Sequence, residues 1–269
     1  MRHKPGVHTG RRGCPLRMHL KLISCEVLYR EMCHAIARSP HQLDVEFLPK
    51  GLHDLGREPM RKKLQECVDA TDGQPFDAIL MGYALCGNGL VGLRARNVPV
   101  VIPRAHDCIA LLMGSRQKYQ TYFEANSGVY FRSTGWLERG GNLEQAFRLY
   151  TGAGRSLEEL VEKYGEDNGQ YLYEQLTSYN RSYNQLTFIE TGLEPDGSFE
   201  QRARDEACRK GWKFEKVAGS LTLFEQLVSG DWAEENFLVL QPGWCVAARY
   251  DGSILTAQRI PGGEAESGH

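Results

Sequence analysis

The sequence predicts an α/β protein with two Rossmann-like lobes on parallel sheets, joined by a helical segment. Three observations predict this class. Short apolar segments alternate with segments of helical periodicity in the first half of the chain, the alternation resumes in the last third, and a long polar stretch with helical spacing separates the two. We therefore expect a first lobe over residues 18–140, a helical connector over 141–185 and a second lobe over 186–260.

Four short apolar segments are the expected strands of the first lobe. They cover residues 20–24, 43–48, 76–83 and 98–102. Each is leucine-rich or β-branched, which is typical of strands buried on both faces. A helical stripe over residues 27–36 and another that starts near Pro59 lie between them. Asp107 and Ser115 are predicted to cap two further helices, and residues 129–132 to form another strand.

The remaining elements follow from the same two periodicities. The polar stretch 142–185 has helical spacing and predicts two or three helices. The second lobe is predicted to contain strands at 186–189, 212–217 and 237–240, with helices at 199–210 and 221–228. The shared alternation of strands and helices predicts two similar lobes with a cleft between them.

Composition excludes several classes of protein. Of the 269 residues, 41% are hydrophobic and 25% are charged, and the formal net charge is −2. This balance argues against nucleic-acid or membrane-surface binding, which needs a basic face, and no apolar run is long enough to span a membrane. Residues 1–17 are basic and lack an apolar core, so we expect no secretory signal. We expect instead a disordered arm, or an extension ahead of a start at Met18, a loose tail over 261–269, and a cytoplasmic protein.

The eight cysteines are the unusual count in this composition. In a reducing compartment they are expected to be thiols or metal ligands rather than disulfides. Cys25, Cys86 and Cys108 follow the first, third and fourth predicted strands, and His106 stands beside Cys108. Because the carboxyl ends of parallel strands meet at one sheet edge, we expect these residues to converge. They suit zinc, with His106 as fourth ligand or acid–base, or a four-iron four-sulfur cluster with one open iron.

Two other interpretations of these cysteines stay open. Cys86 or Cys108, near Arg104 or a helix N-terminus, could have a lowered pKa and act as a nucleophile. All three could also simply pack, since free cysteine is often buried as a small hydrophobe. Cys245 follows the last predicted strand, and its role is left open. Packing or unremarkable helix positions are expected for Cys33, Cys67 and Cys208.

Arg104 is the candidate for binding an anionic substrate, because its guanidinium can hold a carboxylate or phosphate with two hydrogen bonds. The alternative is an ion pair with Glu26 or Asp107. Asp107 is expected to cap its helix, to orient His106, or both. His106, Asp107 and Arg104 are therefore the candidate catalytic residues.

The loop of Gly87, Asn88 and Gly89 has two interpretations. It could be a tight turn, because Asn-Gly accepts positive φ, or it could enter a helix and expose backbone N–H groups to an anion. We take these three residues, Arg104 and Ser115 as candidate substrate-binding residues. The histidines without neighbouring ligand types are expected to be structural or solvated. They are His19, His34, His41 and His53.

Four segments carry a resemblance to a known family. Residues 82–90, with Cys-Gly-Asn-Gly, and 103–109, with Pro-Arg-Ala-His-Asp-Cys, together with 114–115 and 134–136, resemble the uncharacterised family known as domain of unknown function 1638. The resemblance covers nearly all of residues 18–258. Members of this family often stand near corrinoid proteins and methyltransferases of methylamine or betaine metabolism. The resemblance therefore implies one-carbon chemistry and a corrinoid carried by a partner, but it supplies no catalytic residue.

Together these observations favour a metal-dependent enzyme, with zinc or an iron–sulfur cluster, that acts on a small anionic molecule in corrinoid-linked one-carbon metabolism. Methyl transfer and lyase chemistry both stay open. One alternative is a metal or corrinoid carrier or assembly protein without turnover, and another is a metal-free cysteine-nucleophile enzyme. Partners could include a corrinoid protein or methyltransferase, but we expect no nucleic acid and no membrane. If Arg104 faces the metal-bound position, the enzyme is favoured over the carrier.

Overall fold

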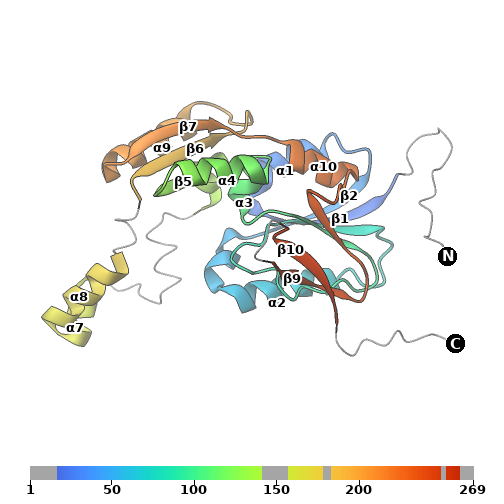
Figure 1. Cartoon of the computed structure of the whole chain (residues 1–269), viewed down its shortest axis with the longest axis horizontal. Coiled ribbons are helices and arrows are strands. Elements are labelled where there is room, and N and C mark those ends of the chain that lie inside the picture. The colour runs from blue at the N-terminus through green and yellow to red at the C-terminus, as the bar shows by residue number, and fades with distance from the viewer. Residues whose placement is uncertain (1–16, 141–156, 178–182, 250–252, 261–269) are drawn as a thin grey trace.

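The structure is a computed structural model that describes residues 17–140, 157–177, 183–249 and 253–260. Its described strands form three sheets: a five-stranded sheet in the order β2-β1-β3-β4-β8, a three-stranded sheet in the order β5-β6-β7, and the pair β9-β10 (Figure 1). The predicted α/β class with parallel sheets is thereby confirmed. The predicted arm, apart from Arg17, the tail and part of the predicted connector lie outside the described residues.

The five-stranded sheet contains the four predicted strands of the first lobe. These are β1 (His19–Cys25), β2 (Gln42–Leu48), β3 (Ala78–Gly82) and β4 (Val100–Pro103), all parallel, and β8 (Phe237–Leu240) runs antiparallel beside β4. Every residue of β3 and β4 is buried, which explains their continuous apolar sequences.

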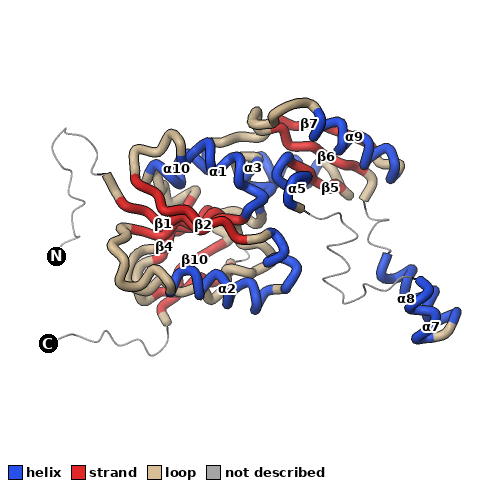
Figure 2. The backbone as a smooth tube through the Cα atoms, turned by 180° about the vertical axis from the view of Figure 1, so that it is seen from behind, coloured by secondary structure: helices blue, strands red, loops and turns tan. Residues whose placement is uncertain are grey.

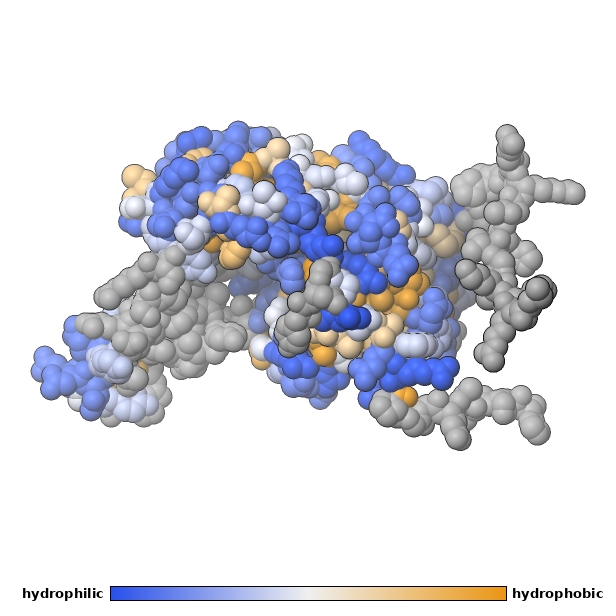
Figure 3. All heavy atoms as spheres, viewed as in Figure 1, coloured by the Kyte–Doolittle hydropathy of each residue, from blue (hydrophilic) through white to orange (hydrophobic). Residues whose placement is uncertain are grey.

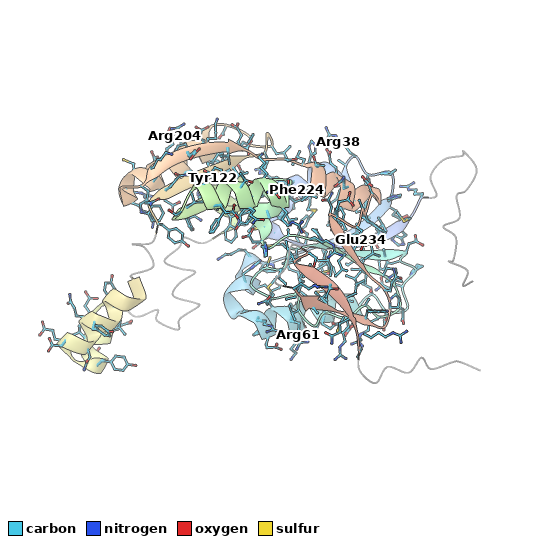
Figure 4. All side chains as sticks on the ribbon, in the orientation of Figure 1. Arg38, Arg61, Tyr122, Arg204, Phe224 and Glu234 are labelled. Atoms are coloured by element: carbon cyan, nitrogen blue, oxygen red, sulfur yellow. The ribbon has the colours of Figure 1, made fainter. Side chains whose placement is uncertain are left out.

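Helices cover one face of this sheet, and a helix with a β-hairpin covers the other. On one side lie α1 (Tyr29–Ile36), α3 (Cys108–Leu112) and α10 (Thr222–Ser229); on the other lie α2 (Arg57–Asp69) and the hairpin of β9 (Trp244–Ala248) and β10 (Leu255–Arg259) (Figures 1 and 2). Short 3-10 helices follow β1 and β2: η1 (Glu26–Leu28) and η2 (Lys50–Leu55). The apolar core extends into these layers, and Phe224 of α10, labelled in Figure 4, is fully buried.

The three-stranded sheet alternates its side chains between two helices. Its strands are β5 (Val129–Ser133), β6 (Gln185–Glu190) and β7 (Lys213–Ala218). Leu186 and Phe188 form a small core with α9 (Ser198–Lys210). On the opposite face, Phe131 contacts the Tyr122 ring of α4 (Arg116–Ala125).

Two strands pair with the other sheet from the one predicted, and this corrects the predicted division of the chain into lobes. Residues 129–132 are predicted in the first lobe, but β5 pairs with β6. Residues 237–240 are predicted in the second lobe, but β8 pairs antiparallel with β4, so the first sheet is not entirely parallel. The reason is physical: an apolar segment such as Phe-Leu-Val-Leu must be buried as a strand, but its periodicity does not specify which edge it pairs with.

The connector contains two helices within its described part, α7 (Leu157–Tyr164) and α8 (Glu166–Thr177), which lie away from the sheets in Figures 1 and 2. In the described ranges no helix is both long and apolar enough to cross a membrane. The face drawn in Figure 3 is largely hydrophilic, with small apolar areas.

The two sheets meet through α5 (Thr134–Arg139), the helix after β5, which packs against η1 after β1. The approach is very close at Gly135, where a Cβ atom would lie 1.7 Å from the carbonyl oxygen of Val27. Since that oxygen belongs to the backbone, the contact has no flexible side chain that could move away. Gly135 is therefore required for the docking of α5 against η1.

We predict that Gly135→Ala lowers the free energy of unfolding by about 3 kcal/mol, because the added methyl group forces the two elements apart. Gly197→Ala is the matched control, since a Cβ atom there meets nothing within 4 Å. Urea denaturation followed by circular dichroism measures both variants. Equal stability of the two variants would contradict the close approach.

Candidate functional site

The carboxyl ends of the parallel strands bring the predicted site residues to one edge of the five-stranded sheet. Ser24 of β1 pairs with Gly82 of β3, so the next residues, Cys25 and Tyr83, follow from neighbouring positions. The backbones are close here, because a Cβ atom at Gly82 would lie 2.2 Å from Ser24 Oγ. This pairing fixes where the chain leaves both strands.

The chain after β3 continues its contacts with the chain after β4. Leu85 N–H donates to the Ala105 carbonyl (2.9 Å), and Cys86 N–H donates to the His106 carbonyl (2.8 Å). The loop then turns through three residues with positive φ, namely Cys86 (47°), Gly87 (63°) and Asn88 (69°). Backbone strain of this kind in non-glycine residues is often found at functional sites.

The thiol groups of Cys25, Cys86 and Cys108, which we call the thiol cluster, lie near one another. Burial raises the pKa of each thiol, that of Cys25 to about 11, and Cys25 contributes to the raised pKa of Cys86. Desolvation also raises the pKa of Cys108, and Asp107 and the other two thiols add to it. The three thiols are therefore neighbours, and their raised pKa values run opposite to the lowered pKa expected of a nucleophile at Cys86 or Cys108.

The backbone and one indole N–H group act on the sulfurs of the thiol cluster. Hydrogen bonds from the backbone of Val27 and Ala84 act on the Cys25 and Cys86 thiols respectively, and each lowers the pKa of its thiol. The indole Nε1–H of Trp136 donates to Cys108 Sγ at 3.3 Å. N–H···S hydrogen bonds favour the thiolate form and are a usual way of tuning sulfur ligands. Trp136 belongs to α5, so the second sheet contributes to this site.

Lys50 and His53, which were not predicted as site residues, lie near Cys25. His53 is expected to be structural or solvated, but its Nε2 lies 4.0 Å from Cys25 Sγ and its ring stacks on Tyr83. Lys50 is only 5% exposed, its Nζ lies 5.6 Å from the Trp136 ring centroid, and its charge lowers the pKa of Cys25. Both follow β2, so the strand-end rule that found the cysteines would have found them too.

Tyr83 adds a buried hydroxyl beside the sulfurs. Within the described ranges its oxygen has no hydrogen-bond partner, although the Cys25 thiol lies near enough to affect its pKa. Desolvation is the largest cause of the raised pKa of Tyr83, and the neighbouring thiols raise it further. An unsatisfied buried hydroxyl is costly unless a ligand completes it.

Arg104 is held by the backbone of the C-terminal segment. Its Nε donates to the carbonyl oxygens of Glu234 (2.8 Å) and Phe237 (3.3 Å), and its Nη1 donates to those of Ser253 (3.1 Å) and Leu255. Glu234 is labelled in Figure 4. Arg104 makes no ion pair with Glu26 or Asp107, the predicted alternative. The contacts give it a structural role, and the predicted substrate role has no support in this geometry.

The other predicted residues serve the local fold. His106 has an exposed ring, and the described residues offer this ring no hydrogen bond or ion pair. Asp107 caps α3 through Ala110 N–H (3.0 Å) and accepts from Tyr119 Oη (3.0 Å), so it does not orient His106. Ser115 caps α4, as predicted.

The loop after Cys86 consists of turns rather than the start of a helix, which favours the turn interpretation over a helix N-terminal anion site. Gly89 lies against Met60, where a Cβ atom would meet the sulfur at 2.4 Å.

The remaining described cysteines are not members of the thiol cluster. Cys245 Sγ donates to the Gln258 carbonyl across the β9–β10 hairpin. Cys67 is buried on α2 beside Glu46, Cys33 is partly buried on α1, and Cys208 is exposed on α9. All seven cysteines in the described ranges are free thiols.

The donor set fits a thiophilic metal, but its atoms have not converged. No group of three or more His, Cys, Asp or Glu side chains is arranged as a metal site within the described ranges. The chemistry of three thiols with N–H donors, a nearby imidazole and an unsatisfied hydroxyl nevertheless suits zinc or an iron–sulfur cluster. Metal binding would therefore require these side chains to move toward one another.

Comparison with known proteins identifies a family but no activity. The sequence model of the family described as "Protein of unknown function (DUF1638)" matches residues 47–228, more than half of the chain. No curated protein and no solved structure matches this chain.

We predict that Arg104→Met lowers the free energy of unfolding by about 2 kcal/mol, because it removes charged hydrogen bonds to partly buried carbonyl groups. Lys62→Met, exposed on α2, is the control. Urea unfolding measures both. A variant as stable as Lys62→Met would show that Arg104 has no structural role.

We predict that in metal-free protein at pH 8 iodoacetamide modifies exposed Cys208 before Cys25 or Cys108. A raised pKa lowers the fraction of reactive thiolate at pH 8, and this fraction increases as the pH approaches the Cys25 pKa of about 11. Peptide mass spectrometry over time follows each site. Modification of Cys25 at the rate of Cys208 would refute the raised pKa.

Proposed function

Since the chain belongs to the DUF1638 family of proteins of unknown function, we propose its function from the site: a metal-dependent enzyme that acts on a small anionic molecule. In this proposal Cys25, Cys86 and Cys108 hold zinc or a four-iron four-sulfur cluster at the edge of a Rossmann-like lobe. The family resemblance adds the proposal of corrinoid-linked one-carbon metabolism, through methyl transfer or lyase chemistry. The observation that carries the proposal is the thiol cluster, with the indole N–H of Trp136 on the Cys108 sulfur.

A bound cation would reverse the electrostatics of the thiol cluster. Three neighbouring thiols with raised pKa values remain protonated near neutral pH, and their sulfurs are then poor ligands. A bound metal reverses this effect, because its charge displaces the protons from coordinating thiols. The N–H donors then stabilise the sulfur charge that forms.

His53 replaces His106 as the proposed fourth group. Two ligands of one tetrahedral zinc, at bond lengths of about 2.0 and 2.3 Å, lie about 3.5 Å apart. The distance of 4.0 Å between His53 Nε2 and Cys25 Sγ is close to this value. If a cluster is bound instead, His53 would serve as a proton donor or acceptor near Cys25.

The other groups at this edge have roles that do not depend on which metal binds. Lys50 places a buried positive charge near Cys25, which favours anionic sulfur and an anionic ligand. Tyr83 can donate its hydroxyl proton to a ligand oxygen. Trp136 fixes the Cys108 sulfur. A bound zinc would supply a Lewis acid, and an open iron site would bind a substrate oxygen.

A carrier or assembly protein for a metal or corrinoid is the second candidate, and the orientation of Arg104 favours it. An enzyme was expected to direct Arg104 and His106 at the ligand, whereas Arg104 contacts backbone carbonyls and His106 is exposed. For an enzyme, Lys50, His53 and Tyr83 must supply the missing functions. The metal-free cysteine-nucleophile enzyme loses support, because the thiol pKa values are raised.

We predict that protein purified without oxygen contains about one zinc, or about four iron and four acid-labile sulfide, per chain. Cys25→Ser, Cys86→Ser and Cys108→Ser should each lose most of this metal, because each removes a sulfur ligand. Elemental analysis, a sulfide assay and the visible spectrum make the measurement.

Cys208→Ser, exposed on α9, is the control and should retain the metal. Circular dichroism shows whether each variant is folded. Folded wild-type protein without stoichiometric metal, or folded thiol-cluster variants with full metal content, would refute the proposal.

A further inference from the structure

A polar pocket of about 580 Å³ lies between the two sheets. One of its lining residues is the neighbour of Cys25 in the sequence, so the pocket is close to the thiol cluster. Its walls are formed by η1, α5 and α9, and its lining residues are Glu26, Leu137, Glu138, Arg139, Phe199 and Arg202. Glu26 is the residue after Cys25, and its charge acts on the Cys25 thiol. Helix α5, which also provides Trp136, lies next to α9 (Figure 2).

Two arginines in this pocket are already oriented. The Arg202 guanidinium lies over the Phe199 ring at 5.6 Å, and its Nη2 donates to the Leu137 carbonyl at 2.9 Å. The Arg139 guanidinium lies over the Tyr29 ring at 4.8 Å. An arginine held in this way loses less side-chain freedom when it binds a ligand, and its planar group suits a carboxylate or phosphate.

Both lining carboxylates have partners other than Arg202. Arg30 donates two hydrogen bonds to Glu138 and so balances its charge. Glu26 is held by Lys50 N–H at 2.8 Å, and only a long contact of 3.5 Å joins it to Arg139. The lining therefore carries two positive and two negative charges, and Arg30, which lies outside the lining, pairs with one of the two carboxylates.

We propose that Arg139 and Arg202 bind the carboxylate or phosphate group of the small-molecule ligand in this pocket. This inference deepens the proposed function, since it assigns to α5 and α9 the anion recognition that was predicted for Arg104. The ligand then lies between the sheets, with its anionic end on the arginines and its remainder toward Glu26 and the end of β1.

The test is calorimetric titration of wild-type protein with inorganic phosphate and, separately, with succinate, at low ionic strength because exposed charges are screened by salt. Arg139→Met and Arg202→Met should each weaken binding about tenfold or more, as expected for a lost charge-assisted hydrogen bond. Arg204→Met is the matched control, because Arg204 lies on the same helix, pairs with Glu200 and does not line the pocket. Its affinity should equal that of wild type. Tighter binding of phosphate or of succinate identifies the anionic group.

Absence of saturable binding of both anions to wild-type protein, or equal affinity of all three arginine variants, would overturn the inference. Metal content separates this result from the proposed function. Arg139→Met and Arg202→Met should retain metal whether or not they bind anions, and Cys86→Ser should lose metal but retain anion binding. Thermal unfolding confirms that each variant is folded.

Discussion

The pairing of Ser24 with Gly82 is the constraint on which the arrangement of the site depends. The two strands approach so closely that only glycine fits opposite the serine hydroxyl, which itself donates to the Gly82 carbonyl at 3.3 Å. This register places Cys25 and Tyr83 at matching positions, each directly after the Ser24–Gly82 pair of adjacent strands. The loop that holds Cys86 then follows from β3, and its contacts with the chain after β4 determine where Cys108 begins α3.

The second sheet contributes helix α5 to the site at the edge of the first sheet. Gly135 lets α5 approach η1, and this approach places Trp136 on the Cys108 sulfur and beside Lys50. Burial raises the pKa values of the thiol groups, whereas the N–H donors and the Lys50 charge lower them. Such a balance is expected where sulfur becomes negative only together with a bound cation. The same docking forms the pocket that contains Arg139 and Arg202.

Much of this architecture follows from patterns within single segments. Apolar runs predict β1 to β4 and β6 to β8, and short polar side chains predict the caps at Asp107 and Ser115. The strand-end rule also predicts the neighbourhood of the three cysteines. The pairing partners of the strands could not be predicted in this way, because β5 and β8 pair with strands that lie far away in the sequence.

The functions of individual polar residues were harder to predict for the same reason. Arg104 contacts carbonyl oxygens more than 120 positions away, which no local pattern reveals. His53 and Lys50 were within reach of the strand-end rule, since they follow β2.

X-ray absorption at the metal edge tests the central claim most directly, because it reports the atoms bound to the metal rather than the loss of metal in a variant. For protein purified without oxygen, the account predicts a sulfur shell at about 2.3 Å, with three protein sulfurs and one nitrogen at about 2.0 Å if the metal is zinc. A shell of only nitrogen and oxygen, or protein that binds no metal, would contradict it.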